Sequence, residues 1–154
     1  ILNKDAIVVT GEEADDQLGI RAVAHGHTIA TIDKDLDNVP GWHYNWQRKE
    51  LYYITPLQAM HHFFTQLLTG DRVDNIPGLF AMTGKKATKN IKGAVAACTT
   101  PEECYAHVFM TYNESTDEPP ETVKAWLLEI GRLLWIRHTE NEMWEPPILK
   151  EIPA

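Results

Sequence analysis

The chain has 154 residues, enough for one compact domain or two small pieces. Its net charge of −8 means that the excess acids either solubilise the surface or gather to hold cations. An apolar content of 44% suits a folded chain, no run approaches the roughly 18 apolar residues of a membrane span, and two cysteines are too few for a disulfide framework.

The N-terminal third of the chain predicts strands and one helix. A β-branched run at 6–9 predicts a buried strand, residues 13–25 show apolar side chains at helical spacing, and residues 28–32 predict a second buried strand. A strand, a helix and a strand in about 30 residues indicate a parallel βαβ unit. Residues 42–46 and 51–54, on either side of a charged turn, predict a hairpin.

From Thr55 onwards the pattern is helical. Thr55 as the cap and Pro56 at the first helical position predict a helix that ends before Gly70. A loop over 71–83 follows. Three further helices are expected, over 84–97, 101–112 and 121–137.

Acidic residues gather at three points, each at the end of a predicted element. One cluster lies at a helix start, one directly after a buried strand, and one in the loop between two helices. The members are, in that order, Glu13, Asp15 and Asp16, then Asp33 and Asp35, then Asp71 and Asp74. Carboxylates at the end of a strand can point into the crevice where open α/β sheets bind ligands, and oxygen-only ligand sets suit Mg²⁺ or Mn²⁺. The alternative for any single cluster is structural, as a partner of the helix dipole or a solubilising loop.

A basic segment follows the third acidic cluster. Lys85, Lys86, Lys89 and Lys92 fall in the helix expected over 84–97, and a loop rich in Gly and Pro leads into it. Such a loop can offer backbone amides to a phosphate while the lysines add charge without sequence preference. A solvated helix face is the alternative. Next to acids that could hold metal, contact with a nucleic-acid backbone is favoured, because the two sites together make a phosphodiesterase.

The three acidic motifs together resemble the 5′–3′ exonuclease and flap endonuclease family, which includes the nuclease domain of bacterial DNA polymerase I and phage exonucleases. The matching segments are Glu-Ala-Asp-Asp at 13–16, Asp-Lys-Asp-Leu at 33–36 and Gly-Asp-x-x-Asp-Asn-Ile-Pro-Gly at 70–78. Their order and spacing agree with the family. Residues 131–137 and 143–147 resemble the C-terminal end of the phage members.

The resemblance implies a phosphodiesterase that cleaves DNA at 5′ ends and flaps with two divalent ions, Mg²⁺ or Mn²⁺, and that also has RNase H-type activity. All seven acids named above match metal ligands of the family. The segment from Pro56 to Ala97 resembles the family's helix–three-turn–helix, which grips the duplex backbone. The implied DNA contacts are Lys85, Lys86, Lys89, Gly78 and Gly84.

The loop of this DNA-binding region departs from the family at two positions. Ala81 and Thr83 replace glycines that, in the family, approach the DNA and help to seat a monovalent cation. Either Gly84 takes over in a shifted loop, or the grip on the duplex is weaker.

The implied fold is α/β. Residues 1–54 would be the remainder of a PIN-like, Rossmann-like parallel-sheet nuclease core, 55–112 the helix–three-turn–helix region, and 113–154 a connector, long helix and tail that pack back on the core. Family members begin with a further segment that supplies more Asp ligands and a basic helical arch, so a start at Ile1 indicates the C-terminal half.

Two other functions stay open beside the 5′ nuclease of which this chain would be an incomplete copy. One is a non-catalytic DNA-binding module, and the other is half of a split nuclease that needs a separately encoded N-terminal partner. In each case DNA is the expected partner, and we expect a monomer in the cytoplasm of a bacterium or of a phage-infected bacterial host.

Overall fold

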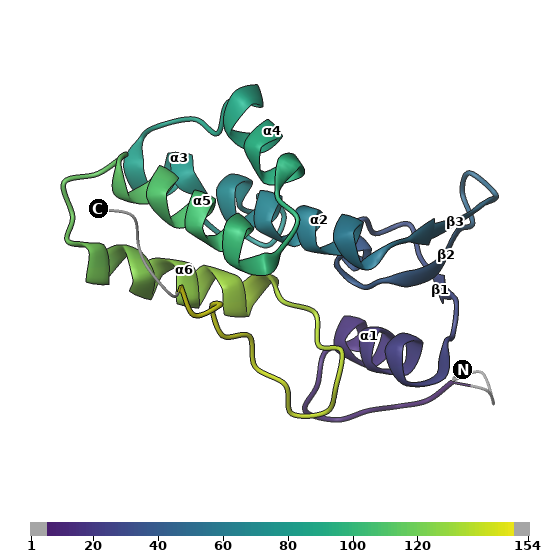
Figure 1. Ribbon diagram of the computed structural model, residues 1–154. Helices are drawn as coiled ribbons and strands as arrows, with labels where there is room; N and C mark the ends of the chain where they lie inside the picture. The colour runs from purple at the N-terminus through teal and green to yellow at the C-terminus, as the bar shows by residue number, and fades with distance from the viewer. Residues whose placement is uncertain (1–5, 150–154) are drawn as a thin grey trace.

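A small sheet and one helix form one end of the molecule, and a group of helices forms the other (Figure 1). The computed structural model describes residues 6–149. In chain order the elements are α1 (Ala14–His25), β1 (Ile29–Ala30), the 3₁₀ helix η1 (Asp35–Asn38), β2 (Gly41–Asn45), β3 (Glu50–Ile54), α2 (Pro56–Thr69), α3 (Leu79–Thr83), α4 (Lys89–Ala97), α5 (Pro101–Asn113) and α6 (Pro120–Leu134).

The sheet has the order β1-β2-β3, with β1 parallel to β2 and β2 antiparallel to β3. The hairpin predicted from the sequence is confirmed, with Trp42 opposite Tyr53. Side chains of β2 alternate, so that His43 and Asn45 are buried while Trp42 and Tyr44 are exposed. The protein is therefore α/β, as expected, but its sheet is mixed and differs from the parallel sheet that the resemblance implied.

The predicted strand at 6–9 is wrong, and the βαβ unit is wrong with it. Ile7 and Val8 are 67% and 68% exposed, and the parallel neighbour of β1 is β2, which follows η1 in the chain. A strand forms only where its backbone amides and carbonyls find a partner strand, and none of residues 6–149 pairs with this segment. The β-branched run wrongly predicted a buried strand, because its residues do not specify the neighbouring strand that would bury it.

Two helices begin and end where their local signals predicted. The Thr55 hydroxyl accepts a hydrogen bond from the backbone N–H of Gln58, the side-chain oxygen of Gln58 accepts one from the backbone N–H of Thr55, and Pro56 opens α2. Gly26 ends α1 in the left-handed conformation at φ 66°. The helix expected over 101–112 is likewise confirmed as α5.

The region 71–97 differs from the prediction. The expected loop contains the short helix α3, which ends at Gly84 with φ 76°. The next helix begins only after Thr88, whose hydroxyl accepts from the Ile91 N–H, so Lys85 and Lys86 precede α4 instead of lying on it. Helix α6 also ends earlier than expected, at Leu134. A left-handed glycine ends the unexpected α3, and a capping threonine makes the helix expected from residue 84 begin only at Lys89.

Helix α2 lies at the centre and packs against α4, α5 and α6. Their apolar faces form the larger core, which includes Phe63, Leu67 and Tyr112, and the Tyr112 hydroxyl donates to the carbonyl of Leu67. Helix α6 thus packs on the helical region. None of the described helices is both long and apolar enough to cross a membrane.

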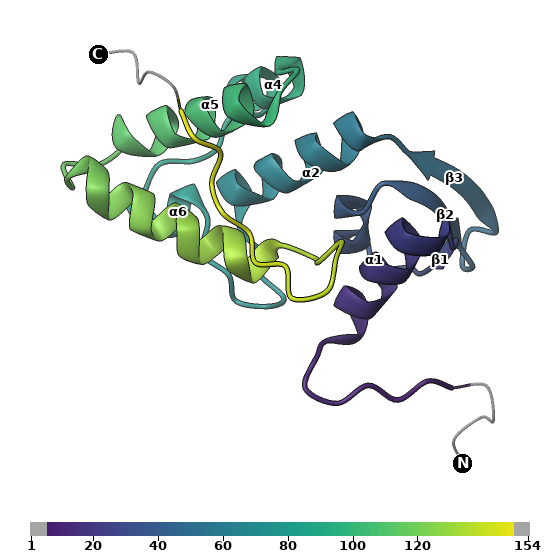
Figure 2. The same cartoon turned by 60° about the horizontal axis from the view of Figure 1, so that its bottom comes forward.

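The segment after α6 connects the two ends of the molecule. It first approaches α1 and then turns back along the helices, as the two views agree (Figures 1 and 2). Ile136 joins a second, smaller core with Ala22, Ile29, Leu36 and Val39, whereas Trp144 joins the larger one. This return path brings residues 134–137 beside the acids of the N-terminal half.

Candidate metal centre

A cleft of ≈ 540 Å³ lies between α1, the turn after β1, the loop after α2 and the segment after α6. Eight carboxylates from three separate stretches of sequence line it. One is Glu12, and the other seven are the complete set predicted from the sequence, namely Glu13, Asp15, Asp16, Asp33, Asp35, Asp71 and Asp74. The fold therefore brings all three acidic clusters to one place.

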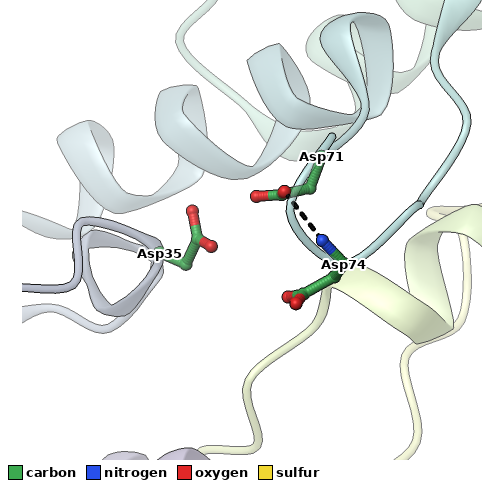
Figure 3. Close-up of side chains that lie close together, drawn as sticks. All are labelled: Asp35, Asp71 and Asp74. Atoms are coloured by element: carbon green, nitrogen blue, oxygen red, sulfur yellow. Dashed lines mark hydrogen bonds between the residues drawn. The ribbon is translucent and has the colours of Figure 1, made fainter.

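Three of these acids lie closest together. Asp35 in η1 faces Asp71 and Asp74 in the loop after α2 (Figure 3). One carboxylate oxygen of each lies within 4.8 Å of the others. Such a group of oxygens could hold a hard divalent cation.

The loop that carries Asp71 and Asp74 is closed on itself. Asp71 and Ile76 exchange two backbone hydrogen bonds, of 3.0 and 2.7 Å. Gly70 adopts φ 65°, and a Cβ on Gly78 would overlap the backbone of Thr69 and Gly70, so both glycines are needed where the loop ends meet. Gly78 is buried there, which gives this predicted DNA contact a structural role.

Backbone amides fix the acids within each turn. The Asp71 Oδ1 accepts from the N–H groups of Val73 at 2.6 Å and Asp74 at 3.2 Å. After β1, Asp33 Oδ1 accepts from the Asp35 N–H at 3.0 Å. These local turns explain why the acids are paired at short spacing in the sequence.

The acids raise each other's affinity for protons. Burial, followed by the charges of Asp33, Asp71 and Asp74, raises the pKa of Asp35 to about 6. Burial and the same kind of repulsion also raise the pKa of Asp15. By contrast, the backbone N–H groups of Asp74 and Val73 lower the pKa of Asp71. The cleft thus concentrates negative charge that a bound cation would neutralise.

Asp16 differs from the other six acids because a cation of the chain already holds it. The backbone N–H of Arg137 donates to its Oδ1 at 2.9 Å, and the guanidinium Nε donates to its Oδ2 at 2.8 Å. The Arg137 Nη1 atom also lies 3.5 Å from Oε1 of Glu12, an acid that the sequence prediction did not include. Asp16 joins α1 to the segment after α6.

Two buried amides beside Asp35 were also absent from the prediction. Gln66 Nε2 donates to Asp35 Oδ1 at 2.7 Å, and Asn38 Nδ2 donates to Gln66 Oε1 at 2.8 Å. One signal in the sequence could have pointed to the buried amide of Gln66. A glutamine stands on the face of α2 that is otherwise apolar, and buried amides are usually hydrogen-bonded.

The predicted DNA contacts follow the acidic loop. Lys85 and Lys86 are exposed between α3 and α4, and Lys89 is the first residue of α4. The Lys85 ammonium donates to the carbonyl of Glu114 at 3.0 Å. Thr83, where the family has glycine, donates its hydroxyl proton to Leu79 O and accepts from the Lys85 N–H, so it helps to end α3.

No protein family model, no curated protein and no solved structure matches this chain. The resemblance to 5′ nucleases therefore rests on the three acidic motifs of the sequence alone.

Proposed function

We propose that this chain carries the metal-binding part of a 5′ nuclease, a structure-specific phosphodiesterase that hydrolyses DNA at 5′ ends and flaps with two divalent cations. The observation that carries the proposal is the convergence of the three acidic motifs on one cleft. Single acidic clusters at element ends are ordinary, but three that meet in one cleft concentrate charge at a cost in repulsion. A purely structural role gives no reason for that cost.

The ligand set fits Mg²⁺ or Mn²⁺. Asp35, Asp71 and Asp74 would hold one ion, and Glu13, Asp15 and Asp33 would contribute to the second. All donors are carboxylate oxygens, which these cations prefer. Bound there, the cations would activate water and stabilise the charge that develops on the phosphate.

The basic segment supplies the other half of the proposal. Lys85, Lys86 and Lys89 would contact the phosphates of the duplex without reading sequence. A protein that only bound DNA would use these lysines and would have no use for seven converging acids. For this reason we place the nuclease above the non-catalytic binding module.

Metal binding tests the proposal without depending on activity. Isothermal titration of the purified chain with Mn²⁺ should show binding, and Asp71→Asn should weaken it by about tenfold or more. Asp117→Asn is the matched control, because Asp117 is an exposed acid in the connector between α5 and α6. Equal binding by the two variants, or no binding by the wild-type chain, would refute the metal site.

Cleavage tests the reaction itself. A 5′-flap duplex incubated with the natural full-length protein and Mg²⁺ should be cut near the branch, and Asp33→Asn with Asp35→Asn should abolish cutting while DNA binding persists. Binding of the duplex without any cleavage by the wild-type protein would instead support the non-catalytic module.

A further inference from the structure

We propose that Gln66 and Asn38 form a positioning relay that fixes the orientation of Asp35 for its metal ion. The proposal rests on the metal site proposed above. Neither residue belongs to the acidic motifs, and neither would touch the ion. Their effect would pass through hydrogen bonds to one carboxylate.

The relay is a continuous line of hydrogen bonds between two acceptors, part-buried at Asp35 and buried at the other two bonds. It begins at the carboxylate of Asp35, passes through the side-chain amides of Gln66 and Asn38, and ends at the backbone carbonyl of Leu134. The last bond, from Asn38 Nδ2 to Leu134 O, is 3.2 Å long. Gln66 is 8% exposed and Asn38 is 2% exposed, so the bond between the two amides is buried, whereas Asp35 is only partly buried at the cleft.

The chemistry of the two ends fixes both amides. An ionised carboxylate can only accept, so Gln66 must turn its NH₂ group towards Asp35 and its oxygen towards Asn38. The carbonyl of Leu134 can also only accept. Asn38 therefore uses both hydrogens of its NH₂ group, one for Gln66 and one for Leu134. A flip of either amide would set oxygen against oxygen.

The side-chain oxygen of Asn38, Oδ1, indicates that Asn38 does more than stabilise the fold. Among the described residues it has no hydrogen-bond partner, although it is buried. A buried acceptor without a donor destabilises the fold, so an apolar residue would suit this position better if packing were its only role. The requirement for two donated hydrogens explains why an amide stands there.

The consequence for Asp35 is that its two oxygens become inequivalent. Oδ1 is held by Gln66, while the carboxylate as a whole faces Asp71 and Asp74 (Figure 3). Hydrogen bonds to the outer side of a metal-ligating carboxylate fix its direction and typically change metal affinity by about 10- to 100-fold. Gln66 is anchored on α2, the central helix, and so provides a rigid reference.

Mn²⁺ titration of the wild type and of the variants Gln66→Met, Leu67→Val and Asp71→Asn tests the relay. Gln66→Met keeps the shape of the side chain but removes the amide, and we expect Mn²⁺ affinity to fall about tenfold or more. Leu67→Val is the matched control, because it removes a buried methylene from the next residue of α2 without touching the relay. Its Mn²⁺ affinity should equal that of the wild type even when its Tm falls as far as that of Gln66→Met.

The outcomes separate the relay from the proposed function. Wild-type affinity in Gln66→Met, together with weakened binding in Asp71→Asn, would overturn the relay and leave the metal site standing. Equal losses in Gln66→Met and Leu67→Val would overturn it too, since packing would then explain both. Absence of Mn²⁺ binding in the wild type would overturn the metal site and the relay together.

A measurement on the wild-type chain covers the case in which Gln66→Met does not fold. In ¹⁵N-resolved NMR spectra, addition of Mg²⁺ should shift the side-chain amide signals of Gln66 and Asn38 with one shared midpoint. The side-chain amide of Asn45, which is also buried but lies in the hairpin, should stay in place. Unmoved signals of Gln66 and Asn38, while the backbone signals of Asp71 and Asp74 shift, would overturn the relay.

Discussion

Asp16 and Arg137 form a two-point contact between residues 121 positions apart in the sequence. Both carboxylate oxygens of Asp16 accept hydrogen bonds, one from the backbone and one from the guanidinium of Arg137. Their side chains are 16% and 19% exposed, so solvent screens the pair only in part. The contact ties α1, which begins beside Glu13 and Asp15, to the segment after α6. That segment directly follows Leu134, whose carbonyl ends the relay.

We expect this contact to contribute measurably to stability. Arg137→Gln should lower the free energy of unfolding by about 1–3 kcal/mol, because it leaves the Asp16 carboxylate partly buried without its charged donor. Urea unfolding monitored by tryptophan fluorescence would measure the change. Arg48→Gln provides the control. Arg48 forms an ion pair with Glu50, and their side chains are 69% and 53% exposed, respectively. Such exposed pairs contribute about 0–1 kcal/mol to stability. A loss no larger than that of the control would contradict a stabilising role.

The same contact predicts that Asp16 contributes less to metal binding than the other acids. Asp16→Asn should destabilise the fold but retain Mn²⁺ affinity within about threefold of the wild type, whereas Asp71→Asn should lose tenfold or more. Titrations would be made on proteins shown by circular dichroism to be folded. An equal loss in the two variants would make Asp16 a ligand, as the family resemblance implies.

Local signals predicted most of the fold. The cap at Thr55 with Pro56, and the alternation in β2, act between near neighbours in the sequence, so α2 and the hairpin were predictable. The segment 6–9 was not, because a strand depends on a partner that its own residues do not specify. Gly84 illustrates a weaker signal, since a glycine in a lysine-rich run did not reveal that one helix ends there.

The candidate site likewise has a part that the sequence predicted and a part that it did not. The acids were predictable because each cluster stands at an element end, where turns aim side chains into a crevice. The partners of those acids were not, because they come from elements distant in the sequence: Gln66 from α2 and Arg137 from the segment after α6. That Arg137 would reach Asp16 and Leu134 would reach Asn38 depends on the return path of the chain, which no local pattern encodes.

Two glycines in the basic region should respond oppositely to the same substitution. Gly84→Ala should destabilise by about 1 kcal/mol, because φ 76° is unfavourable for alanine even though open space surrounds the position. Gly93→Ala should stabilise by about 0.5–1 kcal/mol, because Gly93 lies inside α4 and a Cβ there meets nothing within 4 Å. Thermal unfolding would compare them. The same sign for both would contradict the left-handed end of α3.

The lysines between α3 and α4 predict how DNA binding depends on salt. Lys85→Ala with Lys86→Ala should weaken binding to duplexes of unrelated sequence by similar factors. Each lost phosphate contact should reduce the slope of log affinity against log salt by about 0.9, so the double variant should lose up to about 1.8. Because the Lys85 ammonium also bonds to the Glu114 carbonyl, we expect Lys86→Ala alone to account for at least half of the change.

Fluorescence anisotropy with a labelled duplex at several salt concentrations would measure these slopes. Lys124→Ala on α6 is the control, since the Lys124 ammonium pairs with Glu121 at 2.9 Å on a helix remote in sequence from the acidic loop. An unchanged slope in the double variant, or an equal change in Lys124→Ala, would mean that general surface charge governs binding. A sequence-dependent loss would mean that these lysines contact bases, because contacts to phosphate alone carry no sequence information.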